Sequence, residues 1–369
     1  MISIALEILF HDKLRFVITV VSLGFAIVMM IYDIGMFYGV TQDSVTLVDR
    51  AQAQLWVSKK EEARLNGPSA VPASTLNRAR RLGGVLQACP LDYGMGNLKI
   101  GDTRQVTIVG IDPNCPLFQP WDITAGDAAA LRRRDAIIVD DLALRGLNQA
   151  QVGATVELNG RDLHLVAITH DNKSFSYPFV YVNLQTFATT GGEFGAYSFV
   201  AMQLEPGADQ AGIAQSLAHA GSDLAVTSEE DFRQATILAL VAQGVGMIFV
   251  VVGVGVLVGM LIITLTMYTA TMERLRDFAI LKALGATRWR IWSIVLEQAL
   301  AETGVGFVLG LAASLGLNVF VETLSGIRGR FPLPAIMAAL GVMLALAILG
   351  SLISIRKANS VNPVMVFRA

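Results

Sequence analysis

The chain has 369 residues, of which 53% are hydrophobic and only 16% are charged, and its formal net charge is −2. Soluble domains average about 25% charged residues. A mean hydropathy of +0.55 therefore excludes an ordinary soluble protein and indicates several membrane spans. No basic patch interleaved with aromatic residues is present, so nothing in the chain predicts nucleic-acid binding.

The first 15 residues are predicted to form a cytoplasmic amphipathic helix. Ser3, Glu7 and His11 recur every four positions among apolar residues, which is typical of a helix lying on a membrane surface. The segment lacks the basic start and the small-residue cleavage site of a signal peptide. We therefore expect the first span to remain as an uncleaved anchor.

Four segments are apolar and long enough to cross a bilayer, which takes about 20 residues. They lie at residues 16–38, 237–268, 291–321 and 333–355. Residues 41–235 are too polar to cross a membrane and long enough to fold as a domain. The sequence thus predicts a helical membrane protein with four transmembrane helices and an α+β extracytoplasmic domain inserted between helices 1 and 2.

Basic residues in the short loops predict the orientation of these spans. They concentrate in the loop at residues 269–290 and in the tail at residues 356–369, so both segments and the N-terminus are expected in the cytoplasm. Residues 41–235 then lie outside. The short outer loop at residues 322–332 carries two arginines against this rule, but the cytoplasmic basic residues outnumber them.

The outer domain alternates strand-like and helix-like segments. Strands are predicted at residues 53–58, 105–111, 136–139, 155–158, 163–168, 179–183 and 199–204, and helices at 74–82, 141–145 and 210–220. Asn159-Gly160 between two alternating runs predicts a hairpin turn. Cys89 and Cys115 both lie in this domain, where they can either pair in an oxidising compartment or remain two buried thiols.

The second span is predicted to begin as a stalk outside the membrane. Thr227 and Glu230 have the spacing of a capping box at a helix start. A helix running unbroken from Ser228 to Met272 would be roughly 65 Å long. Because the hydrocarbon core is only about 30 Å thick, the excess from about residue 228 is expected to project outward as a rigid rod.

The chain carries none of the motifs that would make it an enzyme. It has no G-x-x-x-x-G-K-[ST] phosphate loop, no cysteine or histidine cluster with metal-ligand spacing and no G-x-S-x-G element. We therefore expect a non-catalytic subunit without a metal or cofactor of its own.

The cytoplasmic loop after the second span has the features of a short helix. Asp277 favours a helix start, Gly285 fits a C-terminal cap, and Thr287 can begin the third span. Phe278, Leu281 and Leu284 recur every three residues and would form one apolar ridge. Such a ridge suits a groove on a cytosolic partner, although a basic turn lying at the interface explains the same residues.

The run "ERLRDFAILKALGATRWRI" closely resembles the E-R-x-R-E-[FI]-[AG]-I-L-[KR]-A-[LV]-G-A signature of FtsX-like ABC transporter permeases, a mechanotransmission superfamily that includes MacB, LolC/LolE and DevC types. The C-terminal "RKANSVNPVMVFR" and the order of spans are similar too. The outer segment "DYGMGNLKIGDTRQVTIVGIDPNCPLFQP" most resembles the DevC type.

This resemblance implies a permease of the bacterial inner membrane that does not bind ATP itself. It implies a cytosolic ABC ATPase dimer carrying ATP and Mg²⁺, a second copy of this or a homologous permease, surrounding lipid, and a periplasmic adaptor with an outer-membrane duct. ATP-driven motion would pass to the outer domain and drive export. The family motif assigns ATPase coupling to Arg274, Arg276, Asp277, Phe278, Ala279, Ile280, Leu281, Lys282, Ala283, Leu284 and Gly285.

Two further sets of residues stand out within the spans. Asp33, Glu297 and Glu302 are carboxylates in apolar segments, where they serve structure, conformational coupling or substrate and proton chemistry. Close helix packing within or between protomers is predicted at Gly255, Gly259, Gly306 and Gly310.

Three other functions compete with export. A non-transporting FtsX-like protein would regulate an extracytoplasmic enzyme, but such proteins usually have a smaller outer domain and a longer N-terminal region. A sensor or adhesion protein would carry the coupling motif by accident. A membrane enzyme has no predicted site. The sequence does not separate lipid, glycolipid, peptide and drug-like cargo.

Overall fold

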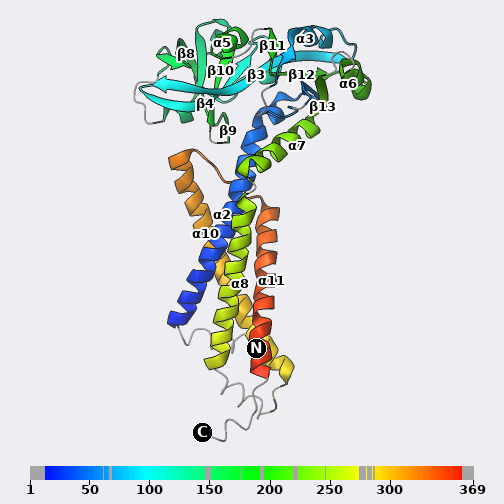
Figure 1. The fold of residues 1–369 in the computed structure, drawn as a ribbon. Helices are drawn as coiled ribbons and strands as arrows, with labels where there is room; N and C mark the ends of the chain where they lie inside the picture. The colour runs from blue at the N-terminus through cyan, green and yellow to red at the C-terminus, as the bar shows by residue number, and fades with distance from the viewer. Residues whose placement is uncertain are drawn as a thin grey trace. The chain divides into compact units, whose positions relative to one another are not determined.

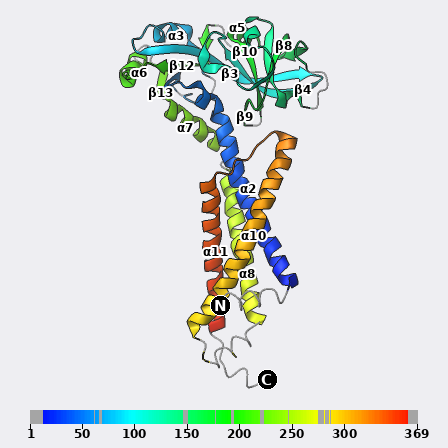
Figure 2. The same ribbon diagram turned by 180° about the vertical axis from the view of Figure 1, so that it is seen from behind.

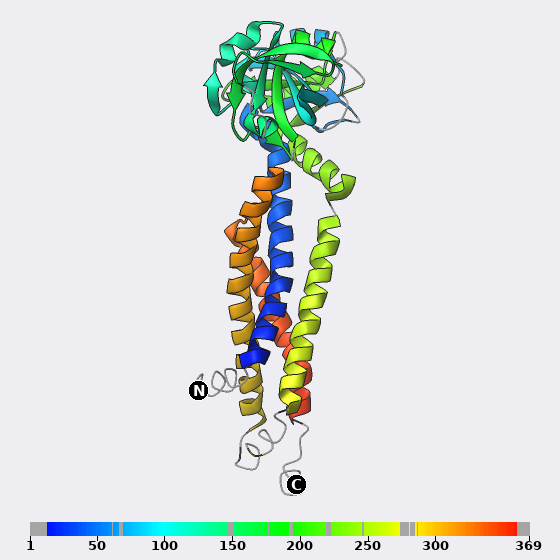
Figure 3. The same cartoon turned by 90° about the vertical axis from the view of Figure 1, so that its left-hand side faces the viewer.

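The computed structural model describes residues 13–60, 62–65, 69–145, 151–175, 177–191, 195–218, 223–245, 247–273, 280, 285 and 287–359. The chain divides into two compact units (Figures 1–3). One comprises Met1–Gly39 and Gly246–Ala369, and the other comprises Val40–Val245. Each unit has its own apolar core, and the helix α2 (Lys13–Ala51) contributes residues to both.

The first unit is a bundle of long apolar helices (Figure 3). Besides the start of α2 it contains α8 (Met247–Glu273), α10 (Arg288–Ser325) and α11 (Leu333–Asn359). Its core packs Leu23 and Ile27 of α2 against Phe307 of α10 and Met343 of α11. Residues 1–12 of the predicted N-terminal amphipathic helix lie outside the described residues.

Three described helices are long and apolar enough to cross a membrane: Val20–Ala51, Trp292–Leu324 and Leu333–Leu352. The chain is therefore a membrane protein. In α8 the corresponding apolar stretch among the described residues is the shorter Gly253–Ile262. The predicted second span, which corresponds to α8, therefore stays a prediction. Helix α2 extends well past the predicted end of the first span at residue 38, which places the start of the outer domain within a helix.

The second unit is built on a mixed sheet whose strand order is β13-β1-β12-β3-β4-β10-β6-β8-β5, with β7 beside β3 and β8, and β9 beside β10 (Figure 1). Strands β10 and β4, and likewise β6 and β8, run parallel. The strands of this sheet are β1 (Leu55–Lys59), β3 (Val85–Ile100), β4 (Asp102–Ile111), β5 (Ile123–Gly126), β6 (Ala136–Asp140), β7 (Thr155–Leu158), β8 (Arg161–Thr169), β9 (Lys173–Ser174), β10 (Tyr177–Asn183), β12 (Phe199–Leu204) and β13 (Leu224–Ser228).

Smaller elements complete the unit, which is α+β as predicted. A separate pair joins β2 (Val71–Pro72) to β11 (Ala196–Tyr197). The helices are α3 (Ala73–Ala79), α4 (Asp141–Leu144), α5 (Leu184–Thr189), α6 (Gln210–Ala218) and α7 (Glu229–Leu240), with single 3₁₀ turns at Pro116–Phe118 and Ala128–Arg132.

The central strand β10 contributes to two of the apolar cores that pack on this sheet. Its residues are nearly all buried, as expected for a continuous apolar run covered on both faces. Successive side chains point to opposite faces: Phe179 and Tyr181 enter one core, with Trp56, whereas Val180 and Val182 enter the other. The predicted hairpin turn is confirmed, since Asn159 and Gly160 have φ values of 49° and 84° between β7 and β8.

The predicted unbroken stalk helix is wrong. Helix α7 ends at Leu240, a single π turn spans Val241–Val245, and α8 begins at Met247. Gly244 has a φ of 120°, a backbone conformation outside the helical region. The predicted cap is one residue off as well, because Ser228 rather than Thr227 caps α7, accepting a hydrogen bond from the Asp231 amide.

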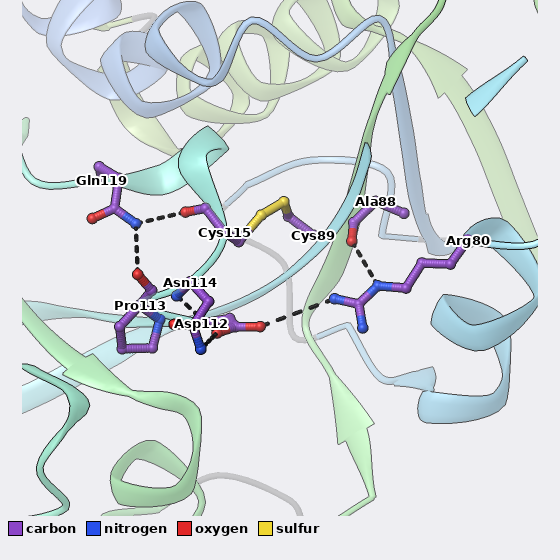
Figure 4. The surroundings of a disulfide bond; sticks show 8 residues. All are labelled: Arg80, Ala88, Cys89, Asp112, Pro113, Asn114, Cys115 and Gln119. Atoms are coloured by element: carbon purple, nitrogen blue, oxygen red, sulfur yellow. Dashed lines mark hydrogen bonds and ion pairs between the residues drawn. A yellow bond between two sulfur atoms is a disulfide. The ribbon is translucent and has the colours of Figure 1, made fainter. Parts of the chain in front are cut away.

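A disulfide joins Cys89 of β3 to Cys115, which precedes the 3₁₀ turn Pro116–Phe118 (Figure 4). Both cysteines are buried, and Gln119 stabilises the turn by donating its Nε2 hydrogen to the Cys115 carbonyl oxygen over 2.6 Å. Of the two possibilities left open for the cysteines, the structure adopts the paired one.

Replacing both cysteines by alanine should lower the free energy of unfolding by about 3 kcal/mol, because the cross-link restricts a long loop of the unfolded chain. The two cysteines are 26 positions apart. Thermal unfolding with and without reductant measures the effect. The double variant should be insensitive to reductant, and a wild-type chain equally insensitive to it would contradict the prediction.

Candidate functional site

Two residues of the predicted ATPase-coupling segment, Ile280 and Gly285, are described in the structure. Ile280 is helical and 40% exposed, and Gly285 has a φ of 89°. Thr287 then caps α10 by accepting a hydrogen bond from the Arg290 amide, so the predicted helix start at this residue is confirmed. The other coupling residues lie outside the described residues: Arg274, Arg276, Asp277, Phe278, Ala279, Leu281, Lys282, Ala283 and Leu284.

An aromatic pair marks the first turn of α10, directly after this segment. The rings of Trp289 and Trp292 are stacked with centroids 4.5 Å apart, and Trp289 is 71% exposed. Amphipathic indole rings of this kind favour the boundary between lipid and water. The pair supports placing the start of α10 at a membrane surface.

The three intramembrane carboxylates occupy different environments. Asp33 of α2 is half-buried, and its Oδ2 atom is buried without a hydrogen-bond partner in the structure. Glu297 is half-buried on α10, whereas Glu302, one turn further along, is only 9% exposed. The structure does not bring the three together in any described contact. Their roles stay a prediction.

The four predicted packing glycines face α2 of the same chain. A Cβ atom at Gly259 of α8 would lie 3.6 Å from the Ala26 Cβ, and Gly255 is next to the same residue of α2. On α10, a Cβ at Gly306 would lie 3.1 Å from Leu23, and one at Gly310 would lie 2.6 Å from Ile27. These contacts let both helices approach α2 closely.

Sequence reasoning missed a third pair of glycines, Gly35 and Gly39, which lies on α2. A Cβ at Gly35 would overlap the ring of Phe331, and one at Gly39 would overlap the Arg328 carbonyl oxygen. The loop before α11 is also held by a hydrogen bond from the Arg330 amide to the Gly35 carbonyl oxygen, 2.8 Å long. The four-residue spacing of Gly35 and Gly39 is the signal that could have revealed this contact.

An ion pair joins the same loop to the end of α10. Arg328 donates from Nε to Glu322 Oε1 over 2.7 Å. An arginine balanced by a neighbouring carboxylate is compatible with the outer side of the membrane. This contact accounts for one of the two arginines that depart from the predicted charge rule.

In the second unit, the outer end of α2 is buried against the sheet and carries charged contacts. Asp43 and Lys173 form an ion pair with side chains only 6% exposed, and Asp49 accepts from Arg233 Nε over 3.0 Å. The Arg50 guanidinium lies over the ring of Trp121 at 5.0 Å. None of these contacts is visible in the sequence, because the partners are far apart along the chain.

Two buried carboxyls of this unit hold protons unusually tightly. Burial raises the pKa of Asp140 to about 7, although it accepts hydrogen bonds from the amides of Asn172 and Leu142. Burial also raises the pKa of Asp92 to about 7, against a hydrogen bond of 2.9 Å from the Ser198 amide. The sequence analysis predicted no special role for Asp92 or Asp140.

Asp92→Asn should stabilise the folded protein above pH 7 by about 2 kcal/mol. The ordinary pKa of this carboxyl is 3.8, so between there and about 7 the folded chain retains a proton that the unfolded chain has lost. Stability therefore falls as pH rises through this window. The variant should lose part of that slope, the remainder coming from Asp140. Thermal midpoints at pH 5 and pH 8 measure it, and parallel wild-type and variant curves would contradict the prediction.

Two protein families match the chain. FtsX-like permease C-terminal matches residues 249–363, and MacB-like periplasmic core domain matches residues 16–220, more than half of the chain. Similar proteins include the uncharacterized ABC transporter permease Rv2563 of Mycobacterium tuberculosis (strain H37Rv), 24% identical over 365 residues and 96% of each chain. The uncharacterized ABC transporter permease YvrN of Bacillus subtilis is 22% identical over 410 residues, covering 100% of this chain and 98% of its own.

Solved structures also match about half of the chain. The periplasmic region of MacB from Actinobacillus actinomycetemcomitans has a TM-score of 0.40 at 12% identity, covering 53% of this chain and 96% of that one. The extracellular domain of the transporter YknZ has a TM-score of 0.36 at 18% identity, covering 47% of this chain and 98% of that one.

Proposed function

Because this chain belongs to the family of FtsX-like permeases with a MacB-like periplasmic core domain, we propose that it relays the motion of a separate cytosolic ATPase to its periplasmic domain and so drives export. Its family makes it an ABC transporter permease, which implies an ATPase partner. The cargo class we propose is a lipid, glycolipid, peptide or drug-like molecule.

The observation that carries this proposal is the segment between α8 and α10. It bears the motif "ERLRDFAILKALGA", and it ends at Gly285, whose φ of 89° is the conformation of a helix C-terminal cap. Thr287 starts α10 two residues later. A short helix with the apolar ridge Phe278, Leu281 and Leu284 would fit a groove on the ATPase.

The proposed function needs one more transmembrane helix besides the three described spans. We propose that α8 is this additional span, the second in chain order, since Gly253–Ile262 is apolar and the helix has 27 residues. Both termini would then face the cytoplasm and the second unit the periplasm. The disulfide in that unit supports the assignment, because disulfides persist in oxidising compartments.

The proposed assembly contains further subunits. A second copy of this or a homologous permease would complete the transporter, and an adaptor with an outer-membrane duct would receive the cargo. ATP and Mg²⁺ would bind the ATPase alone. The likeness of the outer segment to DevC-type permeases stays a prediction.

Affinity purification of the full chain in mild detergent tests the proposal. The chain should retain an ATPase without membrane spans, and ATP hydrolysis in the eluate should follow the chain through size-exclusion chromatography. The control replaces residues 272–286 by a Gly-Ser linker of equal length, which should release the ATPase. Recovery of the same hydrolysis with the linker variant would contradict the proposed docking segment.

A further inference from the structure

Half of the arginines between residues 41 and 235 belong to two short runs on the surface of the second unit. One run spans residues 78–81, at the end of α3, and the other spans residues 132–134, at the end of the 3₁₀ turn Ala128–Arg132. The arginines of both runs are exposed: Arg78, Arg80, Arg81, Arg132, Arg133 and Arg134. Acidic residues outnumber basic ones over residues 41–235, so these runs concentrate positive charge on an acidic unit.

In each run one arginine is bound within the unit. Arg80 donates from Nε to the Ala88 carbonyl oxygen over 3.1 Å, and its Nη2 atom lies 4.0 Å from Asp112 Oδ2 (Figure 4). The Arg133 guanidinium lies 2.9 Å from Asp135 Oδ2. The other four form no ion pair with any residue that the structure describes, and we call them the arginine surface: Arg78, Arg81, Arg132 and Arg134.

The turn that carries Arg132 and Arg134 is fixed by buried polar side chains. Asn183, at the end of β10, donates from Nδ2 to the Arg133 carbonyl oxygen over 2.8 Å. The Thr186 hydroxyl donates to the Arg134 carbonyl oxygen over 2.7 Å. Asn183 is 7% exposed and Thr186 is 1% exposed. A backbone that is already ordered by such bonds loses little conformational entropy when its side chains bind a partner.

The two runs lie at the same end of the sheet. Asp112, which Arg80 contacts, directly follows β4. The last residue of β4, Ile111, is the register partner of Asn183 in the parallel pair of β4 and β10. Because Asn183 holds the second run, both runs flank the carboxyl ends of two neighbouring strands, which are about 5 Å apart. A ligand that reached across these two strands would meet guanidinium groups of both runs.

We propose that the arginine surface docks a carboxylate-rich face of a soluble periplasmic protein. Guanidinium groups bind carboxylates through paired hydrogen bonds, and protein interfaces are enriched in arginine and depleted in lysine. Residues 73–81 and 128–134, all of which the structure describes, expose no large apolar side chain of the kind that a membrane-surface site inserts into lipid. The spread over two runs suits a partner with several carboxylates rather than one small anion. The inference rests on the proposed topology, in which this unit faces the periplasm.

Binding of fluorescent poly-L-glutamate to the full chain in nanodiscs of uncharged phosphatidylcholine tests this inference, with the polymer as the probe of an acidic protein face. The wild-type chain should bind the polymer. Each of two double variants should weaken binding at least about tenfold, because charge-assisted hydrogen bonds are lost. The double variants are Arg78→Gln with Arg81→Gln, and Arg132→Gln with Arg134→Gln.

The matched control removes two exposed lysines outside the arginine surface, Lys60→Gln with Lys99→Gln. It makes the same change of charge and should leave the affinity for the polymer within about twofold of wild type. Unchanged thermal midpoints and complete formation of the disulfide between Cys89 and Cys115 show that the variants fold. Equal weakening by the lysine control, or full binding by either arginine variant, would overturn the inference.

Vesicles of phosphatidylglycerol test lipid as the alternative ligand on the same proteins. The wild-type chain should bind these vesicles no more tightly than the arginine variants do. Arginine-dependent binding to the vesicles that is tighter than binding to the polymer would assign the surface to a membrane and overturn the docking of a protein. These measurements need no ATPase, so their failure and a failure of the proposed docking segment are distinguishable.

Discussion

Leu281→Asp is expected to abolish ATP-coupled export while the chain remains folded and inserted in the membrane. The substitution places a charge in the middle of the apolar ridge formed with Phe278 and Leu284, and a carboxylate is unfavourable in an apolar groove. Because the segment is cytoplasmic in the proposed topology, the bundle and the outer domain should not be affected. Stimulation of ATP hydrolysis and cargo transport in proteoliposomes measure the loss.

Matched variants separate this effect from general damage. Leu281→Met conserves an apolar side chain of similar volume and should retain most transport. At the end of the segment, Gly285→Pro should abolish coupling, since proline fixes φ near −65° where the chain has 89°. Gly285→Asn, which tolerates a positive φ, should retain it. Full transport by Leu281→Asp or by Gly285→Pro would remove the segment from the proposed mechanism.

Gly310→Val should destabilise the membrane bundle by about 3 kcal/mol or more, because it forces a branched side chain into a close helix contact. The added Cβ would lie 2.6 Å from Ile27 Cγ2 and 3.1 Å from the Gly24 carbonyl oxygen. The second contact is with backbone, which a change of side-chain rotamer cannot relieve. The midpoint of thermal unfolding in detergent measures the loss.

Gly304→Val is the matched control for this variant, on the same helix. A Cβ at Gly304 meets no atom within 4 Å. Valine there should therefore be tolerated and should gain slightly from its better helix propensity. Equal destabilisation by the two substitutions would show that helix propensity, and not the contact with α2, decides the outcome.

The fold was most predictable where one local signal dominated. The apolar runs of β6 and β12 and the Asn159-Gly160 turn were found because burial and turn chemistry specify them locally. Strand β3 was missed because Pro90, Gly94 and Gly96 interrupt its pattern. Gly96 is required by a neighbour, since a Cβ there would overlap Ile108 on the paired strand. That requirement is set by tertiary packing and is absent from the sequence of the strand itself.

The break between α7 and α8 illustrates the same limit. The glycines of residues 228–272 all lie between positions 244 and 259, and nothing in their spacing distinguishes Gly244 from those that remain helical, such as Gly255. The coupling segment could be proposed from the sequence because its residues are contiguous. The ion pair between Asp43 and Lys173 could not, since the two residues meet only after α2 and the hairpin β9–β10 have packed together.

The disulfide between Cys89 and Cys115 also provides a chemical signal for the translocation of the domain that contains it. No free cysteine remains among the described residues, and both cysteines of the sequence are in this pair. A maleimide added to intact cells should therefore label newly made chains until the domain has crossed, folded and been oxidised, and mature chains only after reduction and denaturation. Translocation could be timed in the living cell with the natural sequence, without a fused reporter.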